Sequence, residues 1–224
     1  MRTLSLALFA LVTFTAESAF AATCSPGPGV WNEGDGGQGD AGKNFNNANI
    51  TTGVGVLSTI CGNLAETDGT GADMYQIMVL GTTSSASATD RGNSTLDPML
   101  YLFDSSGKAL FANDNASGAT TDSLISTVSI TPGLYFLAIV PAGQEGLNKN
   151  GVDLFTQVTG STTTLSPTST PKVLKDWSNT GNTSGKYIIS LDDAGFAQSP
   201  EPSTLAMMGA SLLALAGLAR KLRA

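Results

Sequence analysis

The sequence predicts an all-β protein, and more narrowly a β-sandwich of the jelly-roll kind. Short segments of alternating apolar and polar residues recur between turn-forming residues through the middle of the chain. Glycine supplies 26 of the 224 residues, and threonine, serine, asparagine and aspartate are abundant, which favours strands and turns over helices. The middle of the chain shows no convincing 3.6-residue apolar period. Six or more short strands joined by turns are typical of a sandwich.

The first expected strand covers residues 73–80, where alternate side chains lie on opposite faces. One face holds Tyr75, Ile77 and Val79, and the other holds Met74, Met78 and Leu80. A hairpin is expected next, with strands at residues 98–103 and 108–113 around a turn at 104–107. Gly107 gives that turn a residue that tolerates a positive φ.

Three further strands are expected towards the C-terminus. Residues 124–130 alternate in polarity. Residues 134–140 are apolar on both faces, which is typical of a central strand. The last strand, at 185–191, is expected to direct three side chains inward, those of Tyr187, Ile189 and Leu191.

Two segments are expected to be irregular. The leader, residues 22–49, consists mainly of turn-formers, with Cys24, Trp31 and Phe45 as anchors. Within the sandwich at 50–197, residues 156–184 are rich in threonine, serine and glycine and predict a long loop. Its docking points would be Leu165, Val173, Leu174 and Trp177.

The N-terminus has the order of a secretory signal peptide. A positive start at Arg2 is followed by an apolar core at 4–14 and by the A-x-A site at 19–21. We therefore expect residues 1–21 to form a signal helix that is read by the Sec machinery and removed. Thr23 before Cys24 does not fit a lipobox, so a lipoprotein is not expected.

Export changes what the two cysteines are expected to do. Outside the cytoplasm Cys24 and Cys61 can oxidise and remain paired, whereas exported free thiols are a liability. We therefore predict a disulfide. The alternative is two unpaired, small apolar residues.

The charge of the exported part excludes one class of partner. Residues 22–199 contain seven basic and sixteen acidic side chains, which gives a net charge of −9. Binding to nucleic acid needs clustered lysine and arginine, so neither nucleic acid nor an anionic membrane is an expected partner. Cations and neutral polymers fit this surface better.

The C-terminus combines a short motif, an apolar run and basic residues. Residues 204–219 carry no charge and would form a helix of about 24 Å, a marginal span for a bilayer core of about 30 Å. Three basic residues follow, Arg220, Lys221 and Arg223, and they favour a cytoplasmic C-terminal end. Before the run, Pro200, Glu201 and Pro202 are expected in extended chain.

This arrangement, within 198–224, resembles the PEP-CTERM sorting signal. The resemblance implies recognition by an exosortase, transient anchoring in the inner membrane, and a link to exopolysaccharide and biofilm in Gram-negative bacteria. The alternative is an ordinary C-terminal membrane anchor with the same positive-inside pattern.

The body carries a second resemblance. Its motifs occur in a fixed order, as GADMY at 71–75, LDPMLYLFD at 96–104, NDN at 113–115 and PGLYFLA at 132–138. This series is similar to the bacterial pre-peptidase C-terminal domain, over roughly residues 50–195, with the long loop as a departure. The resemblance implies a non-catalytic β-sandwich, some relatives of which bind calcium and matrix polymers.

Catalysis is not expected. The sequence has no histidine, which removes histidine-based triads and histidine metal ligands. Carboxylate-dependent hydrolysis would have to use Asp73, Asp97 or Asp104. Each of these lies at an expected strand end or turn, where aspartate is favoured for local hydrogen bonds.

A calcium site is the one cofactor that the residues indicate. Asn113, Asp114 and Asn115, with Gly118 after them, resemble the front of a calcium loop, but Leu124 stands where a bidentate glutamate is needed. Asp104 or Asp122 would then supply the missing charge. The alternative is a plain loop of asparagine and aspartate turns. Asp35 and Asp40 carry the same ambiguity.

The sequence thus favours an exported, non-catalytic protein of the bacterial cell surface or extracellular matrix, with a structural or adhesive role in biofilm or exopolysaccharide. A calcium- or carbohydrate-binding module is the main alternative. Carbohydrate would stack on Trp31, Tyr101 or Trp177, although core packing is the competing role of these rings. A secreted hydrolase that uses carboxylates is the third reading.

Overall fold

The computed structural model describes residues 24–64, 71–91, 95–167, 173–178 and 183–199. The predicted signal segment and the sorting motif Pro200, Glu201 and Pro202, with the basic stop at Arg220, Lys221 and Arg223, lie outside these residues. Among the described residues, no helix has the length and apolar character that a membrane span requires.

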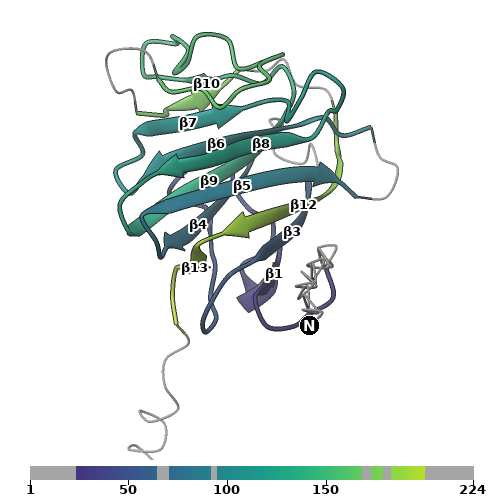
Figure 1. Cartoon of the computed structure of the whole chain (residues 1–224), viewed down its shortest axis with the longest axis vertical. Coiled ribbons are helices and arrows are strands. Elements are labelled where there is room, and N and C mark those ends of the chain that lie inside the picture. Colours follow the sequence, from purple (N-terminus) through teal and green to yellow (C-terminus); the bar gives the residue numbers. More distant parts are fainter. Residues whose placement is uncertain (1–23, 65–70, 92–94, 168–172, 179–182, 200–224) are drawn as a thin grey trace, which may run out of the picture.

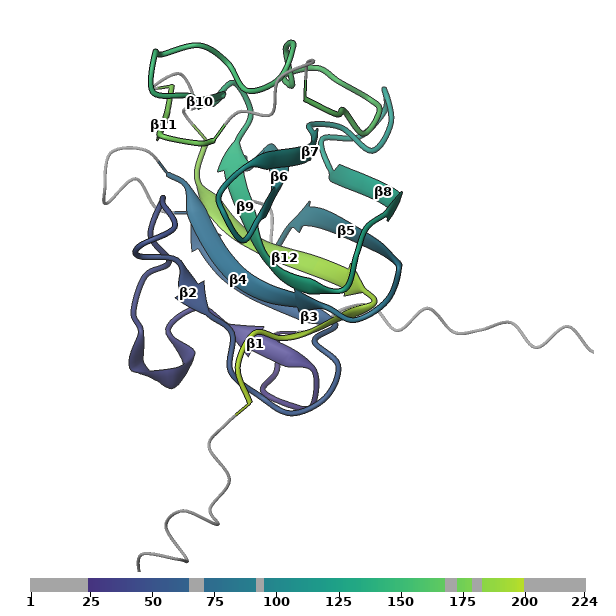
Figure 2. The same ribbon diagram turned by 90° about the vertical axis from the view of Figure 1, so that its left-hand side faces the viewer.

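The described chain is all-β, and its two main sheets pack face to face as a sandwich (Figures 1 and 2). The first sheet has five strands in the order β1 (Val30–Asn32), β3 (Thr59–Leu64), β12 (Gly185–Asp192), β5 (Thr83–Asp90) and β8 (Ser123–Ser129). All of its pairs are antiparallel except β1 with β3, which run parallel.

The second sheet has the order β13 (Ala194–Phe196), β4 (Asp73–Val79), β9 (Gly133–Pro141), β6 (Pro98–Asp104) and β7 (Ala109–Asn113). These strands are antiparallel to one another, and β2 (Asn49–Ile50) adds a parallel pairing to β4. A separate ribbon joins β10 (Gly146–Leu147) to β11 (Asp176–Trp177). The leader also contains a short 3-10 turn, η1 (Asp35–Gly37).

The main core lies between the two sheets. Tyr75, Ile77 and Val79 of β4 face Tyr187 and Ile189 of β12 there, and all five are almost fully buried. The alternation expected from the sequence in these two strands is therefore confirmed. Leu191 joins the same core at its border, where it is partly buried.

A second core lies on the outer face of the second sheet. Met74, Tyr101 and Phe136 belong to it, and they pack beneath residues 142–167 and 173–178, which we call the cover. Leu154 and Trp177 of the cover are almost fully buried. Strand β9 is consequently buried on both faces, as its doubly apolar sequence predicts.

The docking points predicted for the long loop are confirmed in part. Leu174 and Trp177 are buried in the second core, and Leu165 packs against it. Val173, by contrast, is half exposed. The cover is thus more than an insertion, because it shields an apolar sheet face that would otherwise meet water.

The leader is more ordered than predicted. Its strand β1 pairs with β3, and Trp31 of β1 is buried in the main core. Phe45 contacts the rings of Phe103 and Phe136 with centroid separations of 5.6 and 4.9 Å. The leader therefore reaches both cores, and it closes one side of the sandwich (Figure 2).

The predicted disulfide is present between Cys24 and Cys61. Their Cα atoms lie 5.8 Å apart, and the bond joins the start of the leader to β3 across 37 residues of sequence. Cys61 is buried in β3, where it pairs with Asn32 of β1. The bond therefore holds the leader against the edge of the first sheet.

Removing the disulfide should lower the free energy of unfolding by about 4 kcal/mol, because the unfolded chain loses a closed loop of this length. We expect the Cys24→Ala/Cys61→Ala variant to show this loss in urea unfolding. Reductant should destabilise the wild type to a similar degree and leave the variant unchanged. Equal stability of the oxidised and reduced wild type would contradict the prediction.

Candidate functional site

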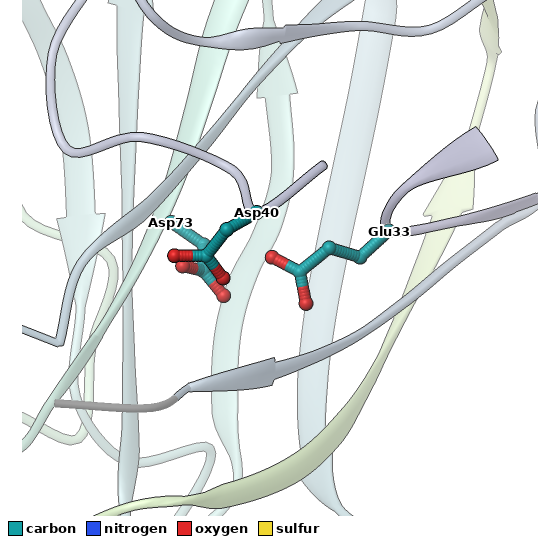
Figure 3. Close-up of side chains that lie close together, drawn as sticks. All are labelled: Glu33, Asp40 and Asp73. Atoms are coloured by element: carbon teal, nitrogen blue, oxygen red, sulfur yellow. The ribbon is translucent and has the colours of Figure 1, made fainter. Parts of the chain in front are cut away.

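Three carboxylates meet where the leader joins the two sheets. Glu33 follows β1 directly, Asp40 lies in the leader loop, and Asp73 is the first residue of β4. One oxygen from each lies within 4.8 Å of the others. Figure 3 shows the three carboxylates pointing toward one another. We call these residues the acidic triad.

Backbone amides hold Glu33 in place. Its Oε1 accepts a hydrogen bond from the Ala41 amide at 2.9 Å, and its Oε2 accepts one from the Asn63 amide at 2.8 Å. One donor belongs to the leader and the other to β3. The Glu33 carboxylate thus fastens the leader to the first sheet.

Asp73 is tied to the interior through two tyrosines. The Tyr187 hydroxyl donates to Asp73 Oδ2 at 2.7 Å, and the Tyr75 hydroxyl lies within hydrogen-bond distance of the Tyr187 hydroxyl. Tyr187 belongs to the first sheet, and Tyr75 and Asp73 to the second. The space for these hydroxyls exists because residue 62 is glycine, where a Cβ would lie 2.2 Å from the Tyr187 oxygen.

Burial sets the protonation of this group. It raises the pKa of Glu33, and the nearby charge of Asp40 adds to the rise, while hydrogen bonds to the carboxylate oppose it. Burial also raises the pKa values of Tyr75 and Tyr187 well above the ordinary value, with a further rise from the charge of Asp73. Both tyrosines are therefore neutral at physiological pH, and Tyr187 donates to Asp73.

The acidic triad has two chemical ways to relieve its repulsion. Carboxylates this close share a proton, so that one of them is neutral, or they coordinate a cation. Glutamate and aspartate oxygens are the hard ligands that Ca²⁺ and Mg²⁺ prefer. The three ligands come from separate segments, so a cation here would join the leader to both sheets.

The residues predicted as calcium ligands fall into two separate places. Register pairs Leu100 with Asn113 and Phe103 with Ala109 in the β6–β7 hairpin. Asp104 therefore lies at the turn, and Asp114 follows the opposite end of β7. The five residues of β7 separate them by roughly 17 Å, at 3.4 Å per residue, so Asp104 does not join the loop around Asp114.

Asp104 instead stabilises the turn. Its Oδ1 accepts hydrogen bonds from Ser106 N, Ser106 Oγ and Lys108 N at 2.8, 2.6 and 3.0 Å. Partial burial opposes ionisation of this carboxyl, but the hydrogen bonds outweigh it and hold the pKa of Asp104 below its ordinary value. Gly107 has the positive φ expected of it, at 81°.

Asn113, Asp114 and Asn115 follow one another at the other end of the hairpin, and Asp122 meets this loop through its backbone carbonyl. The Asn113 side chain is buried, and its Oδ1 accepts the Leu124 amide at 2.6 Å. The Ala116 amide donates to the Asp122 carbonyl, which closes the loop between them. Burial raises the pKa of Asp122, and the charge of Asp90 contributes.

The aromatic residues predicted to stack on carbohydrate are core residues. Trp31, Tyr101 and Trp177 are exposed by 2%, 0% and 3% respectively. The Trp177 indole donates to the Lys43 carbonyl at 2.8 Å, and its ring packs edge-on against Tyr101. The carbohydrate-stacking role is therefore wrong for these three residues, because their faces are used in packing.

The sequence alone does not group the acidic triad. It indicates Asp40 and Asp73 for separate reasons, and nothing in it points to Glu33. Glu33 directly follows β1, a strand that the sequence does not predict, and Asp73 opens the strand predicted at 73–80. The parallel pairing of β1 with β3 places Glu33 at the first sheet, to which Asp73 is tied through Tyr187.

Known proteins supply no function for this arrangement. No model of a protein family matches the chain, and no curated protein sequence matches it either. Function must therefore be argued from the side chains.

Replacing Asp104 with alanine should lower the free energy of unfolding by about 1 kcal/mol, because the turn loses its side-chain acceptor. The loss should be the same in Ca²⁺ and in EDTA, as measured by thermal unfolding. Asp192→Ala, at an exposed position, is the matched control and should change stability little. If the loss of stability depended on Ca²⁺, the result would contradict this prediction and indicate that Asp104 is a metal ligand.

Proposed function

We propose that the chain is an exported, non-catalytic β-sandwich module that acts outside the inner membrane, with a structural or adhesive role at the cell surface or in an extracellular matrix. The observation that carries the proposal is the Cys24–Cys61 disulfide. Such bonds persist in oxidising compartments and are rare in the cytosol. The negative surface favours a partner such as a cation or a neutral exopolysaccharide.

The chemistry of the described side chains supports a non-catalytic role. The sequence has no histidine. Of the three aspartates that a carboxylate-dependent hydrolase could use, Asp73, Asp97 and Asp104, Asp104 stabilises its turn and Asp73 accepts a hydrogen bond from Tyr187. Hydrogen bonds donated to a carboxylate favour its ionised form, which works against a role as general acid.

The finer parts of the proposal come from the sequence. They are the jelly-roll connection, the likeness to the pre-peptidase C-terminal domain, and processing by the Sec machinery and an exosortase. The last step would place the chain transiently in the inner membrane and then at the surface of a Gram-negative cell. Its motif is Pro200, Glu201 and Pro202.

The location and redox state can be tested in one experiment. Full-length protein should be produced in a Gram-negative host that has an exosortase, and thiol trapping should follow fractionation. We expect shortened, fully oxidised protein outside the inner membrane, and expect Glu201→Ala to remain longer in the membrane fraction. Full-length, reduced protein in the cytosol would overturn the proposal.

A second candidate function, binding of a divalent cation, is favoured by the acidic triad. One oxygen from each of Glu33, Asp40 and Asp73 lies within 4.8 Å of the others, and burial disfavours charge on Glu33. A bound cation offsets this charge and holds the leader to the sandwich. A calcium-dependent matrix module would gain a stable leader in this way only outside the cell, where Ca²⁺ is abundant.

Calcium at a hundredfold excess over its Kd should then raise the melting temperature by about 5–10 °C, because it binds only the folded chain. Asp40→Asn should remove the part of this rise that comes from the triad, since it deletes one ligand and keeps the shape. Asp192→Asn is the matched control. If calcium raised the melting temperature equally in the wild type, Asp40→Asn and Asp192→Asn, the acidic triad would be excluded as the calcium site.

A further inference from the structure

A second group of acids lies at the end of the β6–β7 hairpin, apart from the turn at Asp104. Because Leu100 pairs with Asn113, the residue before β6 and the residue after β7 lie at the same end of the second sheet. These residues are Asp97 and Asp114. The hairpin therefore places two aspartates together that are seventeen positions apart in sequence.

A hollow of about 510 Å³ opens at this end. The loop after β7 forms most of its lining, and the cover and Asp97 contribute the rest. Its lining includes Asp97, Asn115, Ser117, Thr120, Gly160 and Thr162. Asp97 is the one charged residue in the lining that the structure describes, and the others offer hydroxyl, amide and backbone oxygens.

Asp114 lies beneath this lining. Only 2% of the residue is exposed. Its Oδ2 accepts hydrogen bonds from Gly160 N and from Asn115 Nδ2, and both donors belong to residues that line the hollow. Its Oδ1 is buried and has no hydrogen-bond partner.

Asp97 also has a carboxylate oxygen that lacks a hydrogen-bond partner. Its Oδ1 is also buried without a hydrogen-bond partner, and burial raises the pKa of its carboxyl. Burial likewise raises the pKa of Asp114 to about 6, and the charges of Asp97 and Glu145 add to the rise. The two aspartates are thus close enough to repel each other, and each has a free oxygen.

Glu145 lies near Asp114, and both of its carboxylate oxygens already accept hydrogen bonds. Its Oε1 accepts from Thr159 N and Thr159 Oγ1 at 3.0 and 2.8 Å, and its Oε2 accepts from Tyr101 Oη at 3.1 Å. It contributes negative potential to the site and is not needed as a ligand. An unpaired buried carboxylate is costly, and here the surrounding charge increases the cost.

We propose that this hollow is a second divalent-cation site, with Asp97 Oδ1 and Asp114 Oδ1 as its two charged ligands. Both oxygens are buried, unpartnered and brought to one place by the hairpin register. Neutral oxygens of the loop from 115 to 121, together with water, complete the coordination. An irregular loop with many neutral oxygens suits Ca²⁺, which accepts six to eight oxygens in flexible geometry, better than octahedral Mg²⁺.

This site is separate from the acidic triad, and it corrects the ligand set that the sequence indicated. Asp114 and Asn115 stay at the site, Asp97 takes the place expected for Asp104, and Asp122 closes the loop through its backbone carbonyl. A cation here would join β6, the loop after β7 and the cover at Gly160.

Calcium binding by the full-length, oxidised chain should be measured by isothermal titration and by thermal unfolding in CaCl₂ and in EDTA. All proteins should carry Asp40→Asn, which weakens the acidic triad. We expect Asp97→Asn and Asp114→Asn each to weaken the remaining binding by at least about tenfold. Asp104→Asn is the matched control and should bind as its parent does.

A second readout separates ligation from a structural role. In EDTA at pH 8, Asp114→Asn should melt at or above the temperature of its parent, because a buried unpaired charge is removed. In CaCl₂ the parent should have the higher melting temperature. Equal calcium shifts in the parent, Asp97→Asn and Asp114→Asn, or no calcium binding once Asp40 is replaced, would overturn the proposal. The second result would leave the acidic triad as the site.

Discussion

Burial of the second sheet on both faces is the constraint on which the rest of the structure depends. Strands β6 and β9 have almost no exposed side chains, because the first sheet covers one face and the cover the other. Charged side chains from these central strands can therefore reach the surface only at the strand ends. Both acidic sites lie at such strand ends, at the end of the sheet where β9 finishes. Asp73 pairs with Ile139 near the end of β9, and Pro98, which follows Asp97, pairs with Pro141.

The same constraint explains the cover and the leader. The outer face of the second sheet carries Tyr101, Phe103 and Phe136, and these rings would be exposed without Trp177 and Phe45 above them. A segment rich in threonine, serine and glycine can perform this function because it needs only a few apolar anchors. Some of its hydroxyls, such as those of Thr156, Thr162 and Thr163, lie in exposed residues, whereas that of Thr159 is bonded to Glu145. An acidic exterior around a doubly covered sheet is what the proposed role outside the inner membrane would require.

The sequence predicted the elements whose signal is local. Alternation in residues 73–80 and 185–191, the turn at Gly107 and the doubly apolar central strand each depend on neighbouring residues, and each is confirmed. The sequence does not predict strand β5, because its inward side chains, Ala86 and Ala88, are small and give a weak apolar alternation. Strand β8 does not alternate simply. A register shift against β5 lets both Ile125 and Val128 reach the main core.

The sites depended on pairings that no local pattern encodes. The parallel contact of β1 with β3 brings Glu33 to Asp73, and the hairpin register selects Asp97 over Asp104 as the neighbour of Asp114. In each case an aspartate or glutamate beside a strand can act either as a local hydrogen-bond acceptor or as a ligand. Which role is open to it depends on whether its carboxylate oxygens already accept hydrogen bonds. Asp104 has three donors on one oxygen, whereas Asp97 and Asp114 each retain a buried oxygen with none. The balance of donors, rather than the number of acids, therefore separates the turn at Asp104 from the proposed cation site at Asp97 and Asp114.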